Sequence, residues 1–445
     1  MIEVFRNPAY LRLFSAQVIA LVGTGLLTVG LGLLAYDLSG DRAGAVLGTV
    51  FAIKMIAYVG LAPVANALAA RWPRKGLLIG ADIVRAVAAL LLPFIDAVWQ
   101  IYALVFVLQA ASAAFTPAFQ ATIPEILPDE RDYTKALSLS RLAYDLENLL
   151  SPALAGLLLV LVSFHWLFAG TVVGFIGSAW LVFTAVIPAT PAGARQRSFL
   201  DRLTRGIRIY VATPRLRGLL ALNLSAAAAG AFVLVNTVVI VRSGYGGGGA
   251  AVAMMMAAFG GGSMLAALAL PRLLETWPDR ALMLAAGILL AGLTCGHGLY
   301  QMLYGLPSWT VLFLLWVLSG MFYAAILTPS GRLLRISAHA EDRPALFAAQ
   351  FTLSHLCWLV TYPIAGWAGA GLGLGEAMAI LGAIGLAGAL AAVLVWPAGD
   401  ALVVEHRHAD LPADHPHLRE HPAADARHRH VFVIDDEHRA WPTHG

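Results

Sequence analysis

Several ionisable side chains interrupt long apolar stretches of this 445-residue chain, where a charge is costly if the stretch crosses a membrane. A carboxyl group in such a place can take up a proton on one side and release it on the other. We therefore expect Asp145 or Glu147 to carry a proton, and Lys54 to balance that charge or to contact an anionic group of a substrate. The alternative is that these three residues form structural or gating ion pairs between helices.

A second group of charged residues lies nearer the ends of the apolar stretches and is suited to ion pairing. Arg141 and Asp145 are four residues apart, so they share one face of a helix and lie close enough to pair. For Asp82, Arg85 and Arg141 we favour gating or interhelical ion pairs over a part in proton transfer.

Histidines are concentrated in the last 48 residues, which contain nine of the 13 in the chain. The pattern His-x-His occurs there three times, and residues two apart in an extended chain project to the same side. Imidazole suits Ni²⁺, Co²⁺, Cu²⁺ and Zn²⁺, so each pair is a candidate clamp for one cation; the alternative is a solvated tail that binds no metal. No other cofactor is expected. The paired residues are His406 and His408, His415 and His417, and His428 and His430.

The composition is that of a membrane protein. Charged residues make up 12% of the chain and hydrophobic residues 59%, whereas a soluble domain has roughly 25% charged residues. A membrane helix needs about 20 apolar residues, and residues 13–397 hold roughly twelve such stretches. The chain is therefore predicted to be an all-α polytopic membrane protein. The stretches begin near Leu13, Ala45, Gly76, Trp99, Ala136, Trp166, Leu216, Ala250, Ala281, Trp309, Pro344 and Gly375.

The second half of the chain repeats the first. The run at 114–117, Ala-Phe-Thr-Pro, is matched 212 residues later by Ile-Leu-Thr-Pro at 326–329. A duplicated bundle of membrane helices is typical of secondary transporters, in which the substrate path runs between the halves. We predict two pseudo-symmetric six-helix bundles, a linker with an amphipathic helix, and a disordered tail. Their bounds are 1–187, 215–397, 188–214 and 398–445 respectively.

Lysines and arginines alternate between the loops in a way that predicts the orientation. With the N-terminus inside, the outer loops carry only Arg42 and Arg242. Both termini are therefore expected in the cytoplasm of a bacterium, with the chain in its inner membrane and no cleaved signal peptide. The basic residues are accounted for by topology and by contacts with the lipid bilayer, so no nucleic acid partner is expected. The protein is expected to act as a monomer.

Several motifs resemble the major facilitator superfamily. Phe5–Phe14, Tyr36–Gly40 and Asp82–Arg85 are similar to its macrolide- and enterobactin-efflux-like branch. The loop after the second stretch carries the basic residues of the superfamily signature, with Asn66 and Ala70 where the signature has Gly and Asp. Those basic residues are Arg71, Arg74 and Lys75, and the resemblance implies a gating role for them.

Two further resemblances suggest the direction of transport and the substrate. Ser151, Pro152 and Gly156 are similar to the Gly-Pro…Gly motif of exporters in this superfamily, which implies proton-coupled export. The histidine-rich tail resembles that of nickel and cobalt exporters. Two substrates stay open: an amphipathic organic compound such as a drug, macrolide or siderophore, or a divalent cation such as Ni²⁺ or Co²⁺.

Other classes of function fit the sequence less well. The chain has no phosphate-binding loop for ATP, and no convincing group of catalytic residues, so it is not expected to be an enzyme. A metal sensor would have no need of two facing halves.

Overall fold

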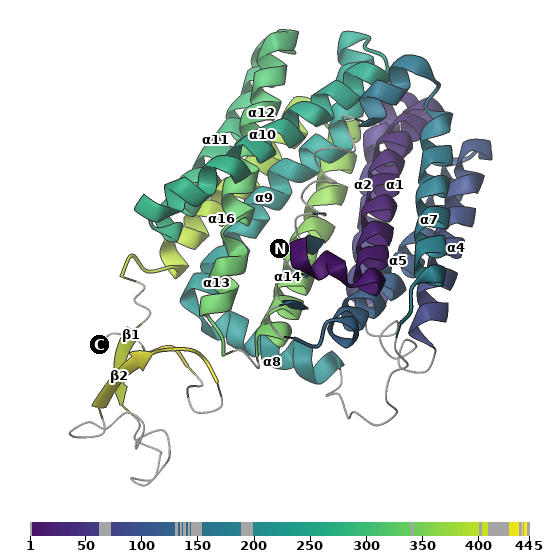
Figure 1. Cartoon of the computed structure of the whole chain (residues 1–445). Coiled ribbons are helices and arrows are strands. Elements are labelled where there is room, and N and C mark those ends of the chain that lie inside the picture. Colours follow the sequence, from purple (N-terminus) through teal and green to yellow (C-terminus); the bar gives the residue numbers. More distant parts are fainter. Residues whose placement is uncertain are drawn as a thin grey trace.

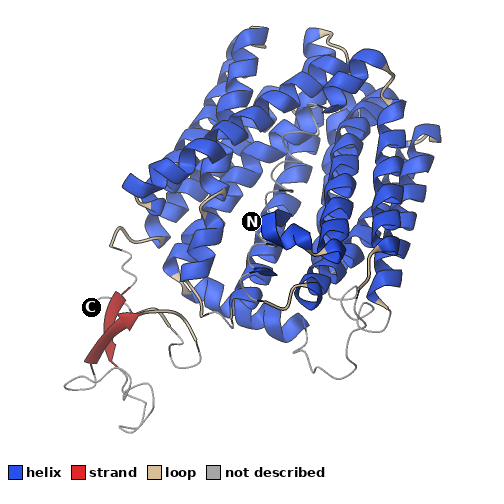
Figure 2. Cartoon of the chain, in the orientation of Figure 1, coloured by secondary structure: helices blue, strands red, loops and turns tan. Residues whose placement is uncertain are grey.

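The computed structural model describes residues 2–61, 73–129, 154–187, 199–339, 342–399, 403–407, 427–435, 438 and 440–442, with a few residues between these ranges. Figure 2 shows that nearly all of the described chain is helical and that two strands pair near its C-terminal end. The all-α class predicted from the composition is confirmed. The helices of the first half are α1 (Pro8–Ser39), α2 (Ala43–Ile56), α4 (Arg74–Leu91), α5 (Val98–Ile126) and α7 (His165–Thr184).

The second half begins after a separate amphipathic helix. Helix α8 (Phe199–Ala212) occupies the part of the linker where apolar residues recur at helical spacing. The helices that follow are α9 (Pro214–Val239), α10 (Gly249–Thr276), α11 (Asp279–Tyr304), α12 (Trp309–Leu327), α13 (Ser330–Ile336), α14 (Arg343–Pro363), α15 (Gly369–Gly371) and α16 (Leu374–Val395). Short π-helical turns continue α2 over Ala57–Leu61 and α14 over Ile364–Ala368.

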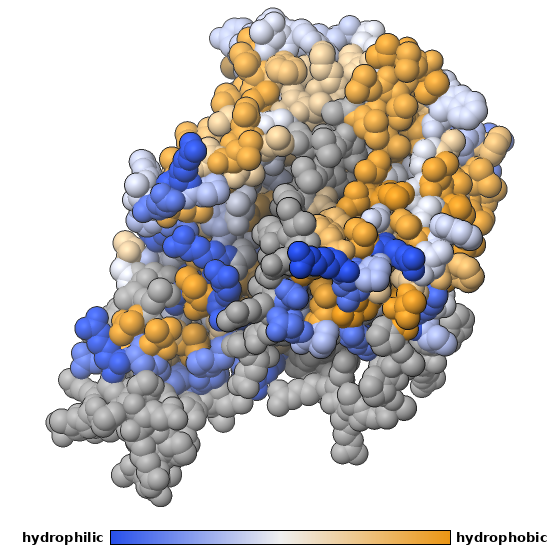
Figure 3. All heavy atoms as spheres, viewed as in Figure 1, coloured by the Kyte–Doolittle hydropathy of each residue, from blue (hydrophilic) through white to orange (hydrophobic). Residues whose placement is uncertain are grey.

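The helices are long and apolar enough to cross a membrane. Ten stretches of the described residues meet this requirement, and the first, Pro8–Gly60, contains both α1 and α2 in 53 residues. At about 1.5 Å per residue such a length allows two crossings. Large apolar side chains are exposed around the helices, among them Phe94 at 79% and Leu394 at 84%. Figure 3 shows this apolar surface, with hydrophilic residues gathered towards the end that carries the tail.

Each half packs through its own set of helix pairs, and α2 joins them. In the first half α1 packs on α7, and α4 on α5 and α7; in the second, α9 and α11 pack on α16, and α10 on α12. Helix α2 packs on α14 and α9 of the other half (Figure 1). Helix α2 approaches the C-terminal part of α14 and its π-helical continuation closely because glycines lie at the contact. A methyl group on Gly366 would lie 2.3 Å from the carbonyl oxygen of Gly44, and one on Gly48 would lie 2.6 Å from that of Tyr362.

The prediction of a disordered tail is wrong for the described part. Strands β1 (Val403–Arg407) and β2 (Arg427–Val431) form an antiparallel hairpin in which His406 lies opposite His428. Val404, Phe432 and Ile434 are buried and join an apolar cluster with residues of α9, α13 and α16. The apolar residues of the tail, such as Phe432 and Ile434, therefore have a core to pack on, and burying them offsets the entropy of ordering the segment.

Candidate functional site

Many of the residues singled out in the sequence lie outside the described part of the chain. These are Arg71, Arg141, Asp145, Glu147, Ser151, Pro152, His408, His415 and His417. Their roles stay predictions.

Lys54 lies in α2, on the helix that joins the two halves. Its Nζ is 5.7 Å from the ring centroid of Tyr58, one turn further along the chain. Tyr58 in turn faces α14 of the second half, where its ring is 6.2 Å from that of Phe351 and 5.7 Å from that of His355. The charged group of Lys54 thus lies beside a ring that contacts the other half.

Aromatic side chains continue along α14 from this point. The ring of Trp358 is 4.9 Å from that of Tyr362 and 6.3 Å from that of Tyr323 in α12. Tyr362 is also 4.9 Å from Phe51 of α2. We call this set the interfacial aromatic cluster, since it lies where the two halves meet. Its members are Phe51, Tyr58, Tyr323, Phe351, His355, Trp358 and Tyr362.

The cluster can contact an organic molecule in two ways. Its ring faces offer apolar area for stacking, and its hydroxyl, indole and imidazole groups offer a few polar contacts. Lys54 adds a positive charge at one side. A divalent cation would find little here, because the cluster has one imidazole and no carboxylate, and the neighbouring charge is positive. Within the described residues no group of three or more histidine, cysteine, aspartate or glutamate side chains is arranged to hold a metal ion.

Asp82 and Arg85 form an ion pair, but the pair lies within one helix and inside the first half. Both residues are in α4 and both are buried, at 0% and 6% exposure. Ser178 of α7 donates a hydrogen bond to Asp82 Oδ2 over 2.7 Å. The guanidinium group lies between the rings of Phe115 and Phe175, at 4.3 and 4.5 Å. This arrangement ties α4, α5 and α7 together and does not reach the other half.

The two described signature residues also contact their own half. Arg74 Nη1 lies 2.5 Å from Glu125 of α5. Lys75 donates a hydrogen bond of 2.9 Å to the carbonyl oxygen of Ala185. In this conformation both residues hold helix ends within the first bundle.

Polar contacts join the halves at the end opposite the tail. The Tyr36 hydroxyl lies 2.8 Å from Ser243 Oγ, and Ser243 also hydrogen-bonds to Asp41. Trp367 Nε1 donates to Thr49 Oγ1 over 3.2 Å. Gly156 of the exporter-like motif is close by, since a methyl group there would lie 3.1 Å from Ala253 Cβ in α10. In the described part of the chain, side-chain hydrogen bonds between the halves are found at this end.

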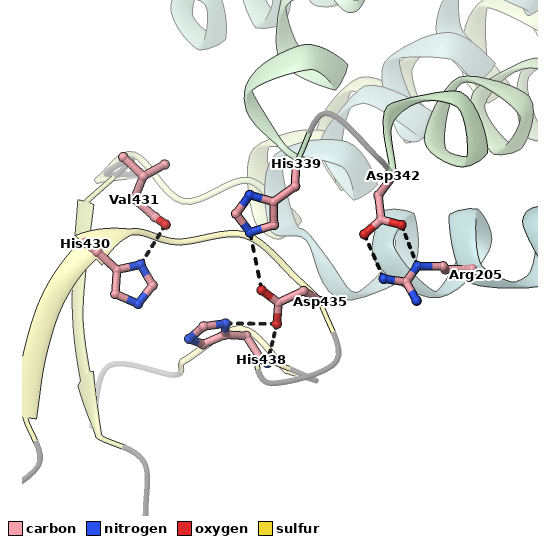
Figure 4. A network of polar contacts seen from close by, with 7 residues as sticks. All are labelled: Arg205, His339, Asp342, His430, Val431, Asp435 and His438. Atoms are coloured by element: carbon pink, nitrogen blue, oxygen red, sulfur yellow. Dashed lines mark hydrogen bonds and ion pairs between the residues drawn. The ribbon is translucent and has the colours of Figure 1, made fainter. Parts of the chain in front are cut away.

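The tail brings together side chains that the sequence analysis did not pair. Asp435 Oδ1 accepts a hydrogen bond from His438 Nδ1 at 3.0 Å. Asp435 Oδ2 lies 3.4 Å from Nε2 of His339, a residue in the turn between α13 and α14 (Figure 4). The His430 ring is 5.2 Å from that of His438. His406 and His428 face each other by register across the hairpin. Sequence reasoning missed His339, whose nearness to the tail follows only from the fold.

A family comparison agrees with this architecture. The model of the Major Facilitator Superfamily matches residues 13–306. The chain belongs to that superfamily. It is a multi-pass membrane protein whose fold is the one expected from the repeat.

Curated relatives are distant. The chain is 27% identical over 237 residues to the uncharacterized MFS-type transporter YfiS of Bacillus subtilis, covering 52% of this chain and 55% of that protein. It is 24% identical over 221 residues to macrolide efflux protein A of Streptococcus pyogenes, covering 48% and 53%. The chain thus spans about half the length of the curated relatives it matches.

Solved structures support the fold over most of the chain. A nucleoside transporter, NupG, superposes with a TM-score of 0.69 at 15% identity, covering 87% of this chain and all of that one. A D-xylose–proton symporter superposes with a TM-score of 0.64 at 15% identity, covering 87% and 97%. At such identities the likeness concerns the fold alone.

Proposed function

We propose that this protein is a secondary active transporter, not an enzyme, that exports an amphipathic organic compound across the bacterial inner membrane. The observation that carries the proposal is the interfacial aromatic cluster, which lies between the two halves with Lys54 beside it. Transporters of this architecture bind their substrate between the repeats and rock the halves around it. The similarity to macrolide efflux proteins supports a drug, macrolide or siderophore-like compound as the substrate.

The proposed cycle is alternating access driven by protons. The hydrogen bonds near Ser243 hold the halves together at the end opposite the tail, so we assign this conformation to the state open towards the tail. The tail, α8 and the basic loops would face the cytoplasm, in line with the distribution of arginine and lysine. Asp145 or Glu147 would carry the proton, and the protein would act as a monomeric antiporter.

Export of Ni²⁺ or Co²⁺, and hence metal resistance, is the second candidate, because the tail is rich in histidine. It is supported by the register that sets His406 opposite His428 and by the nearby His430. In this version the tail would bind Ni²⁺, Co²⁺ or Zn²⁺ and deliver it to the path. The lack of metal-ligand groups among the described residues of the helices favours the organic substrate.

Everted inner-membrane vesicles with an imposed proton gradient test both candidates. Uptake of a radiolabelled macrolide and of ⁶³Ni²⁺ would be measured with the native chain, with Tyr58→Ala, and with a chain ending at Ala398. Macrolide uptake that depends on the gradient and falls with Tyr58→Ala supports the organic substrate. Nickel uptake that falls on truncation and not with Tyr58→Ala would replace it by the metal. If neither the macrolide nor nickel is taken up above the level of vesicles that lack the protein, both substrates are refuted.

A further inference from the structure

A cavity of about 380 Å³ lies between the end of the tail hairpin and the turn that joins α13 to α14. Its apolar lining residues are Ile336 and Ala338 on the bundle side and Val431 and Val433 in the tail. The remaining lining residues are Arg335, His339 and Arg343, all of which can be positively charged. His339 and Val431 mark its two sides in Figure 4. The volume is in the range of small-molecule sites.

The two arginines of this cavity lack counter-ions in the described part of the chain. Neither Arg335 nor Arg343 makes an ion pair with a described carboxylate, and Arg343 Nε is buried without a hydrogen-bond partner there. Burying such a donor unpaired is unfavourable. A ligand that accepts hydrogen bonds at this point would recover that free energy.

Two described carboxylates beside the cavity already have partners of their own. Asp342 accepts two hydrogen bonds from Arg205 of α8, at 2.5 and 2.9 Å. Asp435 is shared by His339 and His438. Figure 4 shows both groups of contacts, with Asp342 turned towards α8 and Asp435 towards the two histidines. The lining itself contains no described acidic residue.

We propose that this cavity, which we call the tail cavity, binds a phosphate group. Two arginines on one side of a small cavity form the pattern that recognises phosphate, because each guanidinium offers several donors in a fixed plane. The apolar lining residues suit the less polar part of a larger molecule. The phosphate could belong to an anionic lipid headgroup or to a free phosphate compound. Because the tail supplies one wall, the bound anion would also help to hold the hairpin against the bundle.

The test uses the purified full-length chain in neutral detergent. Native mass spectrometry measures bound phosphatidylglycerol against phosphatidylcholine, and isothermal titration calorimetry measures binding of inorganic phosphate. The double variant Arg335→Gln and Arg343→Gln removes both charges. At about 1 kcal/mol for each basic residue near a membrane surface, binding should weaken about 30-fold. Arg272→Gln, an exposed arginine outside the cavity, is the control and should bind as the native chain does.

A second pair of variants keeps the arginines in place. Val431→Asp adds a negative charge to the cavity wall at a position that is 54% exposed, so folding should tolerate it. Val403→Asp adds the same charge to the strand partner of Val431, outside the lining. We expect the first to weaken binding and the second to leave it unchanged.

The two arms of the test identify the source of the phosphate. Selective loss of phosphatidylglycerol binding assigns the site to a lipid headgroup, and selective loss of inorganic phosphate binding assigns it to a free anion. Either outcome supports the proposal. If neither ligand binds, or if both bind the double variant and the native chain equally, the tail cavity is not a phosphate site.

Discussion

Replacing Phe432 by alanine is expected to detach the tail hairpin from the helix bundle. Phe432 is 2% exposed, and its ring stands edge-on to Trp441 at 5.1 Å and to His438 at 4.7 Å. The guanidinium of Arg215, at the start of α9, in turn lies 5.1 Å from the ring of Trp441. Phe432 is therefore at the centre of the contact between the tail and the bundle.

The size of the effect follows from the burial of this ring. Truncating a buried phenylalanine to alanine costs about 3–5 kcal/mol. The described tail docks through few other buried apolar side chains, namely Val404, Val433 and Ile434. A loss of about 3 kcal/mol raises the undocked fraction of the hairpin by more than about 100-fold.

Hydrogen–deuterium exchange of the full-length chain measures this change directly. Amides of 403–407 and 427–434 should exchange faster in Phe432→Ala, while amides of the bundle helices keep their native rates. Val403→Ala, in the same hairpin but 37% exposed, should exchange as the native chain does. Native protection of both strands in Phe432→Ala would show that this ring does not hold the tail to the bundle.

Three further predictions concern the bundles. Asp82→Asn leaves Arg85 buried without its counter-ion, which costs about 3–5 kcal/mol; the thermal unfolding midpoint in detergent should fall, and an unchanged midpoint would contradict the structural role. Gly366→Ala places a methyl group 2.3 Å from a carbonyl oxygen of α2, at a cost of about 1–3 kcal/mol. In Gly366→Ala, cysteines placed in the α1–α2 turn and at the end of α9 should cross-link less efficiently. Gly371→Ala, where an added methyl group meets open space, should cross-link as the native chain does. Lys54→Gln should lower transport of acidic substrates at least about 10-fold through loss of a charge-assisted contact and spare neutral ones in proteoliposomes; equal rates for both would exclude that contact.

Most of the membrane architecture could be predicted from the sequence, because its cause is local. A crossing helix needs about 20 apolar residues in succession, and that requirement can be read one segment at a time. The predicted starts near Trp99, Trp166 and Trp309 lie within one residue of the observed helices at Val98, His165 and Trp309. Helix α8 likewise follows from the spacing of its apolar residues.

The tail shows where local reasoning fails. Its composition is polar and rich in histidine, which favours a solvated segment. The few apolar residues that it does have, such as Phe432 and Ile434, decide the outcome because the bundle offers them an apolar surface. That surface is built from helices far away in the chain, so no window of the tail sequence contains it.

What the sequence determined by itself is the class of protein, the twofold repeat and the approximate limits of the helices, since hydrophobic length and spacing act within each segment. The tertiary structure alone decided which side chains meet. Tyr58 and His355 come together across the two halves, and the arginines of the tail cavity face a strand that begins more than 80 residues later. Such pairs are selected by the packing of helices and the close approach of their glycines, which depend on the whole chain at once.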